Sequence, residues 1–397
     1  MKGRGALAYG VGLVAFLCAG FWLGGHPARL PGFIREHIVS SPAALSAEAA
    51  EVLEDNYYRP VGGTELGNSS VQGMVRELRR RHKEDRFTEY FSPESRESFN
   101  QQIEGHFSGV GISVVPVKRG LHAVKVFAGS PAAKAGIEVG DTIVSVDGDS
   151  IAGASSNAAT EKIKGPEGTE VTLGVLDAKN GKVRQLRVTR AEVALPNVSS
   201  KVVVKNGHKL GYVRMLSFSE GVHALLANAV RKVQREGAEA ILLDLRGNPG
   251  GLLDEAVLSA SLFLPADEVV VSTDSRTQGH SVLKTVGGAL PKLPLAILID
   301  RNTASAAEIL TAALADDAGA TVVGTRSYGK GVFQEEKGLS NGGALKMTVG
   351  EYFTPDGVNL ARSHGIHPDV KASDDPETPV DEGKERALGV LAGQVEG

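Results

Sequence analysis

Cysteine and tryptophan are almost absent from the chain, with one residue of each among 397. The single cysteine, Cys18, has no partner for an internal disulfide and lies in an apolar segment, where a soluble catalytic thiol is not expected. Aromatic residues make up 5% of the chain, and no basic stripe interleaves with them. The formal net charge of -4 gives no electrostatic reason to expect nucleic acid. These absences exclude a disulfide scaffold and argue against a nucleic-acid-binding protein.

Charge is also missing from residues 6–23, an apolar segment that Lys2 and Arg4 precede. As a helix, its 18 residues nearly cross a hydrocarbon core of about 30 Å. Positive charges before it favour an orientation that sends the following chain across the membrane. A cleaved signal peptide is the alternative, but no A-x-A cleavage site follows directly. We therefore predict an uncleaved anchor in the inner, cytoplasmic membrane, with the remainder in the periplasm or at the cell exterior.

The hydrophobic period changes twice along the rest of the chain, which indicates separate domains. Apolar residues first recur at helical spacing, then alternate as in short strands from His106, and finally follow an α/β pattern from Lys209. The predicted parts are a signal or membrane anchor at 1–24, a linker at 25–42, an N-terminal helical region at 43–105, a compact β-rich domain at 106–192, an α/β core at 193–372, and a charged C-terminal tail at 373–397 with a short helix near 385–395.

Turns that carry glycine or serine follow the buried strands of the α/β core. These strands are continuous apolar runs, as at 241–243 and 295–299. In open α/β sheets, functional residues gather at the carboxyl ends of strands. The first turn, 244–251, ends in Gly250 and Gly251 but lacks the G-K-[ST] ending of a phosphate loop. Its glycines can instead present backbone N–H groups to a developing oxyanion.

The second turn places Ser305 directly before an apolar helix. Ser305-x-x-Glu308 is a capping-box pattern, so a purely structural serine is one interpretation. A serine at a helix start is also exposed, and the N–H of Ala306 can face an anion there. Because the two interpretations are compatible, Ser305 is a candidate nucleophile.

The third turn, 327–334, holds Lys330 between two glycines. An ordinary surface lysine is the simplest interpretation. A serine nucleophile needs a base, however, and a lysine that is neutral through burial can serve. Gln334 can hydrogen-bond a neutral amine without charging it. His364 and His367 form an H-x-x-H pair without an evident third ligand, so we predict no metal site.

Several ordered motifs between residues 43 and 372 resemble the carboxyl-terminal processing peptidases, also called tail-specific proteases. The motifs are GYVRMLSFSE, DLRGNPGGLLDEAV, NTASAAEIL, GKGVFQ, ALKMTVGEYFTPDGVNL and GIHPDV, with the lysine 25 residues after the serine. The resemblance implies an α/β core related to the crotonase and Clp-protease fold. The site residues that it implies are Ser305 as nucleophile, Lys330 as general base, Gln334 as the partner that orients the lysine, and Ala306 with Gly250 or Gly251 as oxyanion donors.

The β-rich domain resembles a PDZ domain through GVGI and SPAAKAGIEVGDTIVSVDG. The first motif takes the place of the loop whose backbone N–H groups bind a terminal carboxylate. The strand after it can accept an extended peptide as an additional strand, beside a helix expected at 155–164. A glycine-containing hairpin without a ligand is the alternative. The predicted loop residues are Gly109, Val110, Gly111 and Ile112.

The resulting prediction is a serine endopeptidase with an inserted PDZ domain that recognises C-terminal tails of extracytoplasmic proteins. The implied partners are protein C-termini and the membrane, without nucleic acid and without a metal or organic cofactor; a homo-oligomer or an activating adaptor stays open. One alternative is a PDZ-bearing scaffold with an inactive peptidase-like domain. Another is a different crotonase-fold enzyme, such as an acyl-thioester hydratase, which would need a coenzyme A site. One departure from the family, Glu84-Asp85-Arg86 before Tyr90, puts local helix packing in doubt but not catalysis.

Overall fold

The computed structural model of the protein describes residues 42–194, 197–288, 290–374, 378 and 380–396, which form two compact units. One unit holds the described residues up to Pro93 together with Gln334–Thr348, and the other holds Glu94–Phe333 and the residues from Val349 on. The predicted anchor at 1–24, and the linker up to residue 41, lie outside the described residues. Within the described ranges, no helix is both long and apolar enough to cross a membrane.

The first unit contains helices α3 (Pro42–Asn56) and α4 (Gly63–Arg81) and strand β1 (Glu89–Phe91), which pairs antiparallel with residues 344–346. Asp85, in the segment that departs from the family pattern, caps the turn before β1. Its carboxylate accepts hydrogen bonds from the backbone of Phe87 and Thr88 and from the hydroxyls of Thr88 and Thr348. Burial opposes ionisation of Asp85, but these hydrogen bonds outweigh it and lower the pKa of the carboxyl. The departure therefore forms a well-connected turn.

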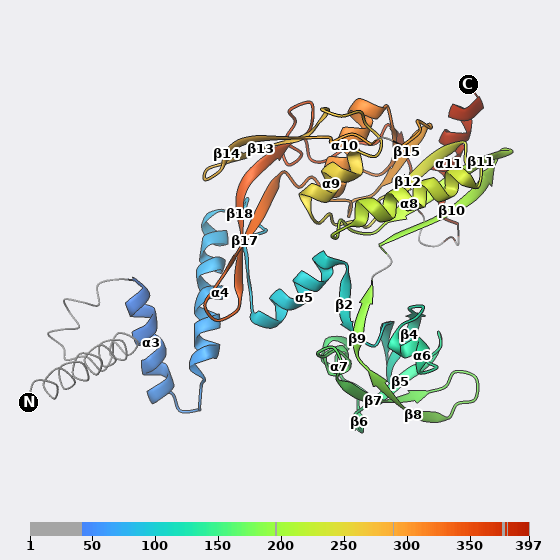
Figure 1. The fold of residues 1–397 in the computed structure, drawn as a ribbon. Helices are drawn as coiled ribbons and strands as arrows, with labels where there is room; N and C mark the ends of the chain where they lie inside the picture. Colours follow the sequence, from blue (N-terminus) through green and yellow to red (C-terminus); the bar gives the residue numbers. More distant parts are fainter. Residues whose placement is uncertain (1–41, 195–196, 289, 375–377, 379, 397) are drawn as a thin grey trace, which may run out of the picture. The chain divides into compact units, whose positions relative to one another are not determined.

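The β-rich domain occupies residues 106–194 of the second unit (Figure 1). Strands β2 (His106–Gly109) and β9 (Ala191–Ala194) pair antiparallel, so the chain enters and leaves the domain side by side. The remaining strands form a sheet in the order β3-β4-β5-β7-β8, with β6 beside β5. The elements are β3 (Ile112–Val117), β4 (Gly120–Val126), α6 (Pro131–Lys134), β5 (Thr142–Val146), β6 (Asp149–Ser150), α7 (Ser156–Ile163), β7 (Glu170–Leu176) and β8 (Val183–Thr189), and helix α5 (Pro93–Glu104) precedes them.

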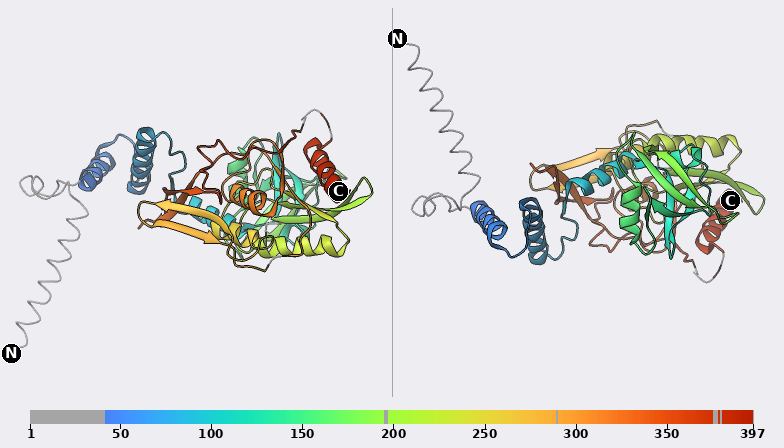
Figure 2. Two further views of the ribbon diagram at one scale, coloured as in Figure 1. Left: turned by 90° about the horizontal axis from the view of Figure 1, so that it is seen from above. Right: turned by 90° about the horizontal axis from the view of Figure 1, so that it is seen from below.

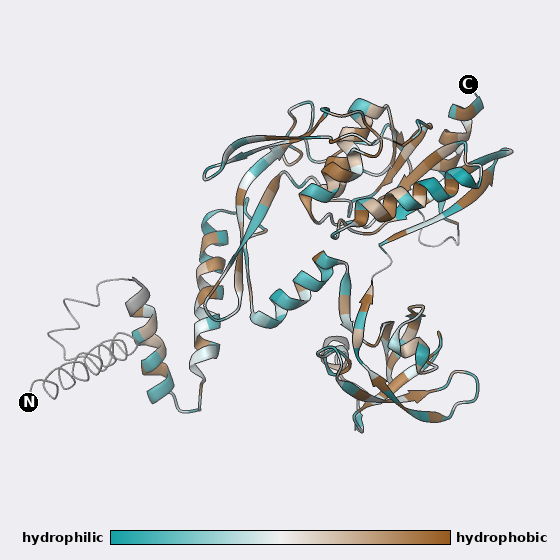
Figure 3. Cartoon of the chain, viewed as in Figure 1, coloured by the Kyte–Doolittle hydropathy of each residue, from teal (hydrophilic) through white to brown (hydrophobic). Residues whose placement is uncertain are grey.

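The α/β core is built on a six-stranded sheet in the order β10-β11-β12-β15-β16-β19, parallel from β11 onward. Its central strands, β12 and β15, are buried at every residue, as their apolar runs predict, and are drawn brown in Figure 3. The sheet strands are β10 (Val198–Lys205), β11 (His208–Met215), β12 (Ala240–Asp244), β15 (Leu295–Ile299), β16 (Thr321–Gly324) and β19 (Val370–Lys371). The other strands are β13 (Val269–Ser275), β14 (Gly279–Lys284), β17 (Val332–Gly338) and β18 (Ala344–Phe353).

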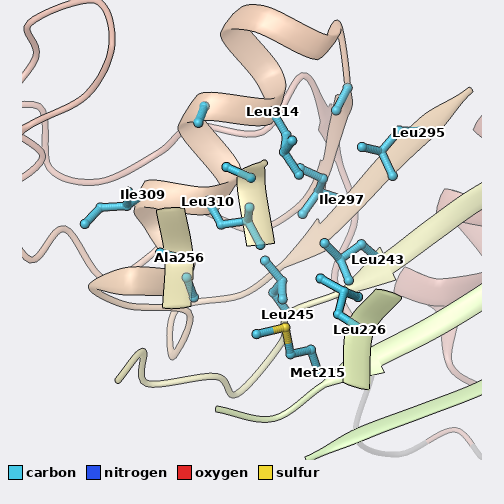
Figure 4. Packing of buried hydrophobic residues seen from close by; sticks show 14 of the residues in the cluster. Met215, Leu226, Leu243, Leu245, Ala256, Leu295, Ile297, Ile309, Leu310 and Leu314 are labelled. Atoms are coloured by element: carbon cyan, nitrogen blue, oxygen red, sulfur yellow. The ribbon is translucent and has the colours of Figure 1, made fainter. Parts of the chain in front are cut away.

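Helices cover both faces of this sheet. Side chains of alternating direction along β11, β12 and β15 belong to two separate hydrophobic clusters. Helices α8 (Val222–Arg235), α9 (Leu253–Ala260) and α10 (Ala306–Ala318) pack in the first cluster (Figure 4), and α11 (Glu382–Glu396) packs in the second. Figure 2 shows α11 (red) and α8 (yellow-green) on opposite sides of the strands. The C-terminal segment, predicted as a charged tail with a short helix, thus contributes to the core.

Candidate active site

The three predicted turns follow neighbouring parallel strands of the sheet. β12 ends at Asp244, β15 at Ile299 and β16 at Gly324. The strands are in close register, with Asp244 opposite Leu298 and Ile299 opposite Gly324. Because the strands are parallel, their carboxyl ends share one edge. The sheet therefore brings together turns that are far apart in the sequence.

Ser305 lies in a strained backbone conformation at the start of α10. Its φ of 57° and ψ of -122° are outside the regions that a residue with a Cβ atom favours. The predicted capping box with Glu308 is present. The N–H of Ser305 donates to Glu308 Oε2 at 2.9 Å. A strained turn between a strand and a helix is how hydrolases expose a nucleophilic serine.

The carboxylate of Glu308 joins the second and third turns. Oε2 accepts hydrogen bonds from the N–H groups of Ser305 at 2.9 Å and Lys330 at 3.0 Å. Oε1 accepts from the Gly329 N–H at 2.7 Å and the Ser327 hydroxyl at 2.5 Å. Burial raises the pKa of Glu308, although these four hydrogen bonds oppose the shift. All four neighbours donate, so they match a carboxylate that only accepts.

The glycines on both sides of Lys330 allow the third turn to pack tightly. A Cβ atom at Gly329, where φ is 83°, would lie 2.8 Å from the backbone nitrogen of Gly365. A Cβ atom at Gly331 would lie 2.2 Å from Oδ1 of Asn359. Asn359 also donates from Nδ2 to the Gly331 carbonyl at 2.8 Å. The two glycines therefore fix the backbone of Lys330, whose side chain is half-buried.

The first turn reaches Ser305 at Gly250. A Cβ atom at Gly250 would lie 2.8 Å from Cβ of Ser305 and 2.9 Å from N of Ala306, so only glycine fits. The N–H of Gly250 is engaged, because it donates to Asn248 Oδ1 at 2.9 Å. Within the described part of the chain, the N–H groups of Gly251 and Ala306 have no hydrogen-bond partner. Of the two glycines predicted as alternatives, Gly250 therefore has an engaged N–H group and lies against Ser305, whereas the Gly251 N–H accounts for no hydrogen bond among the described residues.

Tyr352 of β18 is a site residue that sequence reasoning missed. Its hydroxyl donates to the Lys330 carbonyl, and its N–H donates to the Gly331 carbonyl at 3.1 Å. Burial raises the pKa of Tyr352 well above its ordinary value, the charge of Glu308 adds to the shift, and only the interaction with the Ser305 hydroxyl opposes it. Tyr352 therefore stays neutral and keeps its proton for donation. The motif that contains it was recognised, but nothing in its pattern indicated this contact.

Gln334 lies in the other compact unit, so its predicted contact with Lys330 stays a prediction. Its Nε2 donates to the Thr348 hydroxyl at 3.4 Å. The described residues contain no group of three or more His, Cys, Asp or Glu side chains that could hold a metal ion. The turn of His364 is tied to the lysine turn, since the Ile366 N–H donates to Ser327 Oγ at 2.7 Å.

The predicted carboxylate loop lies directly before β3, which is an edge strand of its sheet. The carbonyls of the loop are held inward: Val110 accepts from Ala132 N at 2.8 Å, and Gly111 accepts from Phe127 N at 3.0 Å. Gly111 has a φ of 83°, and a Cβ atom there would lie 2.3 Å from Cβ of Ser130. The other two loop residues belong to the flanking strands. Gly109 ends β2 and pairs with Ala191, and Ile112 begins β3 and pairs with Val126. An edge strand can accept an additional strand from a peptide.

Comparisons with known proteins agree with this architecture. Residues 209–372 match Peptidase family S41, and residues 98–176 match the PDZ domain. The carboxy-terminal processing protease CtpA of Bacillus subtilis (strain 168) is 32% identical over 325 residues, covering 82% of this chain and 68% of that protein. A probable CtpA-like serine protease of Staphylococcus haemolyticus (strain JCSC1435) is 31% identical over 326 residues. The match covers 81% of this chain but 63% of that relative, so this chain spans less than two thirds of its length.

Solved structures give the same result for the fold. The photosystem II D1 C-terminal processing protease is 26% identical, with a TM-score of 0.50 and coverage of 89% of this chain and 97% of that one. A putative S41 protease from Bacteroides fragilis NCTC 9343 has a TM-score of 0.55 at 19% identity, covering 87% of this chain and 97% of that one. The predicted α/β core with an inserted PDZ domain is confirmed, and the chain belongs to peptidase family S41, among the carboxyl-terminal processing proteases.

Proposed function

We propose that the protein is a serine endopeptidase that cleaves proteins captured by their C-terminal tails. The observation that carries the proposal is the Glu308 carboxylate, which accepts hydrogen bonds from the backbone of both Ser305 and Lys330. A serine nucleophile needs a base whose position is fixed relative to it, and one shared buried carboxylate can provide that. The relatives named as processing proteases support the same activity.

In the proposed reaction, the Ser305 hydroxyl attacks the scissile carbonyl and its proton passes to the neutral amine of Lys330. The N–H groups of Gly251 and Ala306 stabilise the resulting oxyanion, as does the N-terminus of α10. Collapse of this intermediate breaks the peptide bond, and Lys330 returns the proton to the leaving amine. Lys330 then removes a proton from water, the hydroxide attacks the acyl-enzyme carbonyl, and Lys330 returns the proton to Ser305 Oγ as the ester bond breaks. Gln334 is the proposed orienting partner of the lysine.

The PDZ domain is the proposed site of substrate capture. A terminal carboxylate would be bound by the N–H groups of the loop at 109–112, and the peptide would extend along the edge strand β3. The inward-held carbonyls of Val110 and Gly111 support this, because they fix the loop's conformation. We further propose that residues 6–23 anchor the protein in the membrane and that its substrates are extracytoplasmic.

An activity-based probe and a peptide assay test the proposal together. The wild-type protein should react with a fluorophosphonate at Ser305 and should cleave an unstructured protein with a free, apolar C-terminus. The Ser305→Ala variant should do neither while folding normally. Binding of tails without any labelling or cleavage would instead support an inactive PDZ-bearing scaffold. Saturable binding of coenzyme A would support the other crotonase-type alternative.

A further inference from the structure

Arg246, in the first turn, is held by carboxylates from two places in the sequence. Asp244 lies in the same turn, whereas Asp374 and Asp381 lie more than a hundred residues later. Arg246 Nε and Nη2 donate to Asp244 at 3.0 and 2.8 Å. Its Nη1 donates to Asp374 and to Asp381 at 2.8 Å each, and Nη2 also donates to Asp381 at 2.9 Å. Arg246 is 13% exposed, and Asp244 is fully buried. Two-pronged arginine–carboxylate pairs of this kind fix the plane of the guanidinium as well as its position.

Asp374 and Asp381 belong to the C-terminal segment that ends in α11. Four residues of α11 are fully buried against the six-stranded sheet: Ala387, Leu388, Leu391 and Ala392. The Lys384 N–H donates to Asp381 Oδ1 at 2.9 Å, so the carboxylate is fixed to the start of the helix. A separate ion pair, Lys205–Glu385 at 2.8 Å, joins the same helix to β10. The carboxylates that reach Arg246 therefore come from a well-packed element.

The conformation of the first turn depends on residues that follow Arg246 closely. Asn248 stands two residues later, and its carbonyl accepts a hydrogen bond from Ala304 N at 3.0 Å. Its Oδ1 accepts from Gly250 N at 2.9 Å. Gly250 in turn lies against Ser305 with no room for a side chain. A shift at Arg246 would thus reach the backbone beside the proposed nucleophile within a few bonds.

We propose that Asp381, together with Asp374, is a positioning residue of the active site. Through Arg246 it holds the first turn, and thereby keeps the Gly251 N–H in place for the oxyanion. This role rests on the proposed function, because the oxyanion forms only in the proposed peptidase reaction. The match to the peptidase family ends at residue 372, so both carboxylates come from the chain beyond it.

The contacts of Arg246 with Asp374 and Asp381, here called the clamp, keep their charges at every pH near neutrality. Burial opposes ionisation of Asp381, but hydrogen bonds from Arg246 and Lys384 outweigh it and lower the pKa of Asp381 to about 2. Asp381→Asn therefore removes a charge that the native protein always carries, at nearly constant side-chain size. Its effect should not depend on the protonation of this group between pH 6 and pH 9.

Two variants in the same segment test the clamp. Asp381→Asn removes the charge and one of the two oxygens that accept from Arg246, whereas Glu385→Gln removes the ion pair with Lys205 and leaves Arg246 untouched. Steady-state cleavage is measured per active site, titrated with a fluorophosphonate, alongside the melting temperature. We expect Asp381→Asn to lower kcat about tenfold with KM unchanged, since a charge-assisted hydrogen bond that supports the oxyanion turn is lost. Glu385→Gln should keep the wild-type kcat, and Asp381→Glu should recover part of the loss.

Hydrogen exchange gives a readout that does not depend on activity. The backbone amides of the first turn should exchange their hydrogens faster in Asp381→Asn than in Glu385→Gln. Both variants are measured at the same interval below their own melting temperatures. A wild-type protein without peptidase activity would overturn the proposed function, while faster exchange in this turn would still support the clamp. Unchanged exchange and unchanged kcat in Asp381→Asn would overturn the clamp, and so would an equal loss of kcat in Glu385→Gln. If Asp381→Asn does not fold, the same comparison is made with Asp374→Asn.

Discussion

Glu308 accepts a hydrogen bond from the backbone of Lys330 at 3.0 Å, across 22 residues of sequence. The same carboxylate holds the N–H of Ser305 at 2.9 Å. A helix-capping residue thus also sets the backbone of the proposed base relative to that of the proposed nucleophile. Glu308 has no role in bond making in this scheme, and its importance comes from geometry.

Glu308→Gln should damage both activity and stability. Glutamine keeps one acceptor oxygen, and its NH₂ group would face donors that now bind the second oxygen. We expect a loss of about 2–3 kcal/mol in the free energy of unfolding and a fall in kcat of at least about tenfold. Chemical denaturation and peptide cleavage measure the two effects. Glu236→Gln, at the exposed C-terminal end of α8, serves as the control, and normal kcat in Glu308→Gln would contradict the bridging role.

Ser305→Ala and Lys330→Ala should each abolish cleavage without unfolding the protein. Because the two groups act as one unit, the double variant should be scarcely slower than either single variant. Lys330→Arg should also be inactive, since a guanidinium stays protonated and cannot accept the serine proton. Cleavage rates are compared at equal active-site concentration, and folding is checked by circular dichroism. Substantial turnover by Lys330→Arg would exclude the lysine as the base.

Asp316 should make the stability of the protein depend on pH. Burial, followed by repulsion from Asp356 and Asp317, raises the pKa of Asp316 from 3.8 to about 6. Between these two values the folded state binds the proton more tightly than the unfolded state, so this group stabilises the fold as the pH falls. Asp316→Asn should therefore raise Tm at pH 7.5. The difference from the wild type should shrink towards pH 4, because Asp316 is already protonated in the folded wild type there; a lower Tm for the variant at pH 7.5 would contradict the shift.

Tail capture should depend on the free carboxylate of the substrate and on Gly111. Amidation of the tail removes a charge-assisted interaction, which should weaken binding about tenfold or more. Gly111→Val should act similarly, because its Cβ atom would collide with Ser130. Gly181→Val is the matched control, with the same left-handed backbone but open space around it. Binding of fluorescent tails by anisotropy measures both effects.

The kinetics of the same variant separate delivery from activation. If the PDZ domain only delivers substrate, Gly111→Val should raise KM for tailed proteins and leave short, tail-independent peptides unaffected. If it also activates the protease, kcat for the short peptides should fall as well. Equal cleavage of amidated and free-acid substrates would leave the PDZ domain without the proposed role.

The sequence predicts the active-site residues best where a reactive side chain lies in a turn directly after a buried strand. Ser305 and Lys330 could be selected because each lies in a turn that follows a buried strand, inside a motif that resembles a known family. Glu308 was recognised only as a cap, since the local pattern accounts for it fully and gives no sign of a contact 22 residues away. The pattern does not single out Tyr352 for a similar reason, because tyrosine is common in strands and needs no functional explanation there.

The C-terminal segment shows why composition can mislead. Its charges suggested a tail, yet the apolar residues of α11 recur on one face and fill the second side of the sheet. Asp374 and Asp381 contribute to that charged appearance, but their partner, Arg246, lies more than a hundred residues away. Pairing over such distances depends on tertiary structure, which no local pattern records.

The antiparallel pairing of β2 and β9 has a consequence for how the chain folds. The long excursion through residues 106–194 begins and ends at adjacent residues, with His106 opposite Ala194. Once this domain has formed, its two ends are adjacent, so residues 106–194 add little to the effective length of any loop that spans them. The entropy lost on closing that loop has already been lost in folding the domain. The pairing that benefits is the one that spans the domain: β1 pairs with residues 344–346, and the loop between them becomes effectively shorter once the domain has formed.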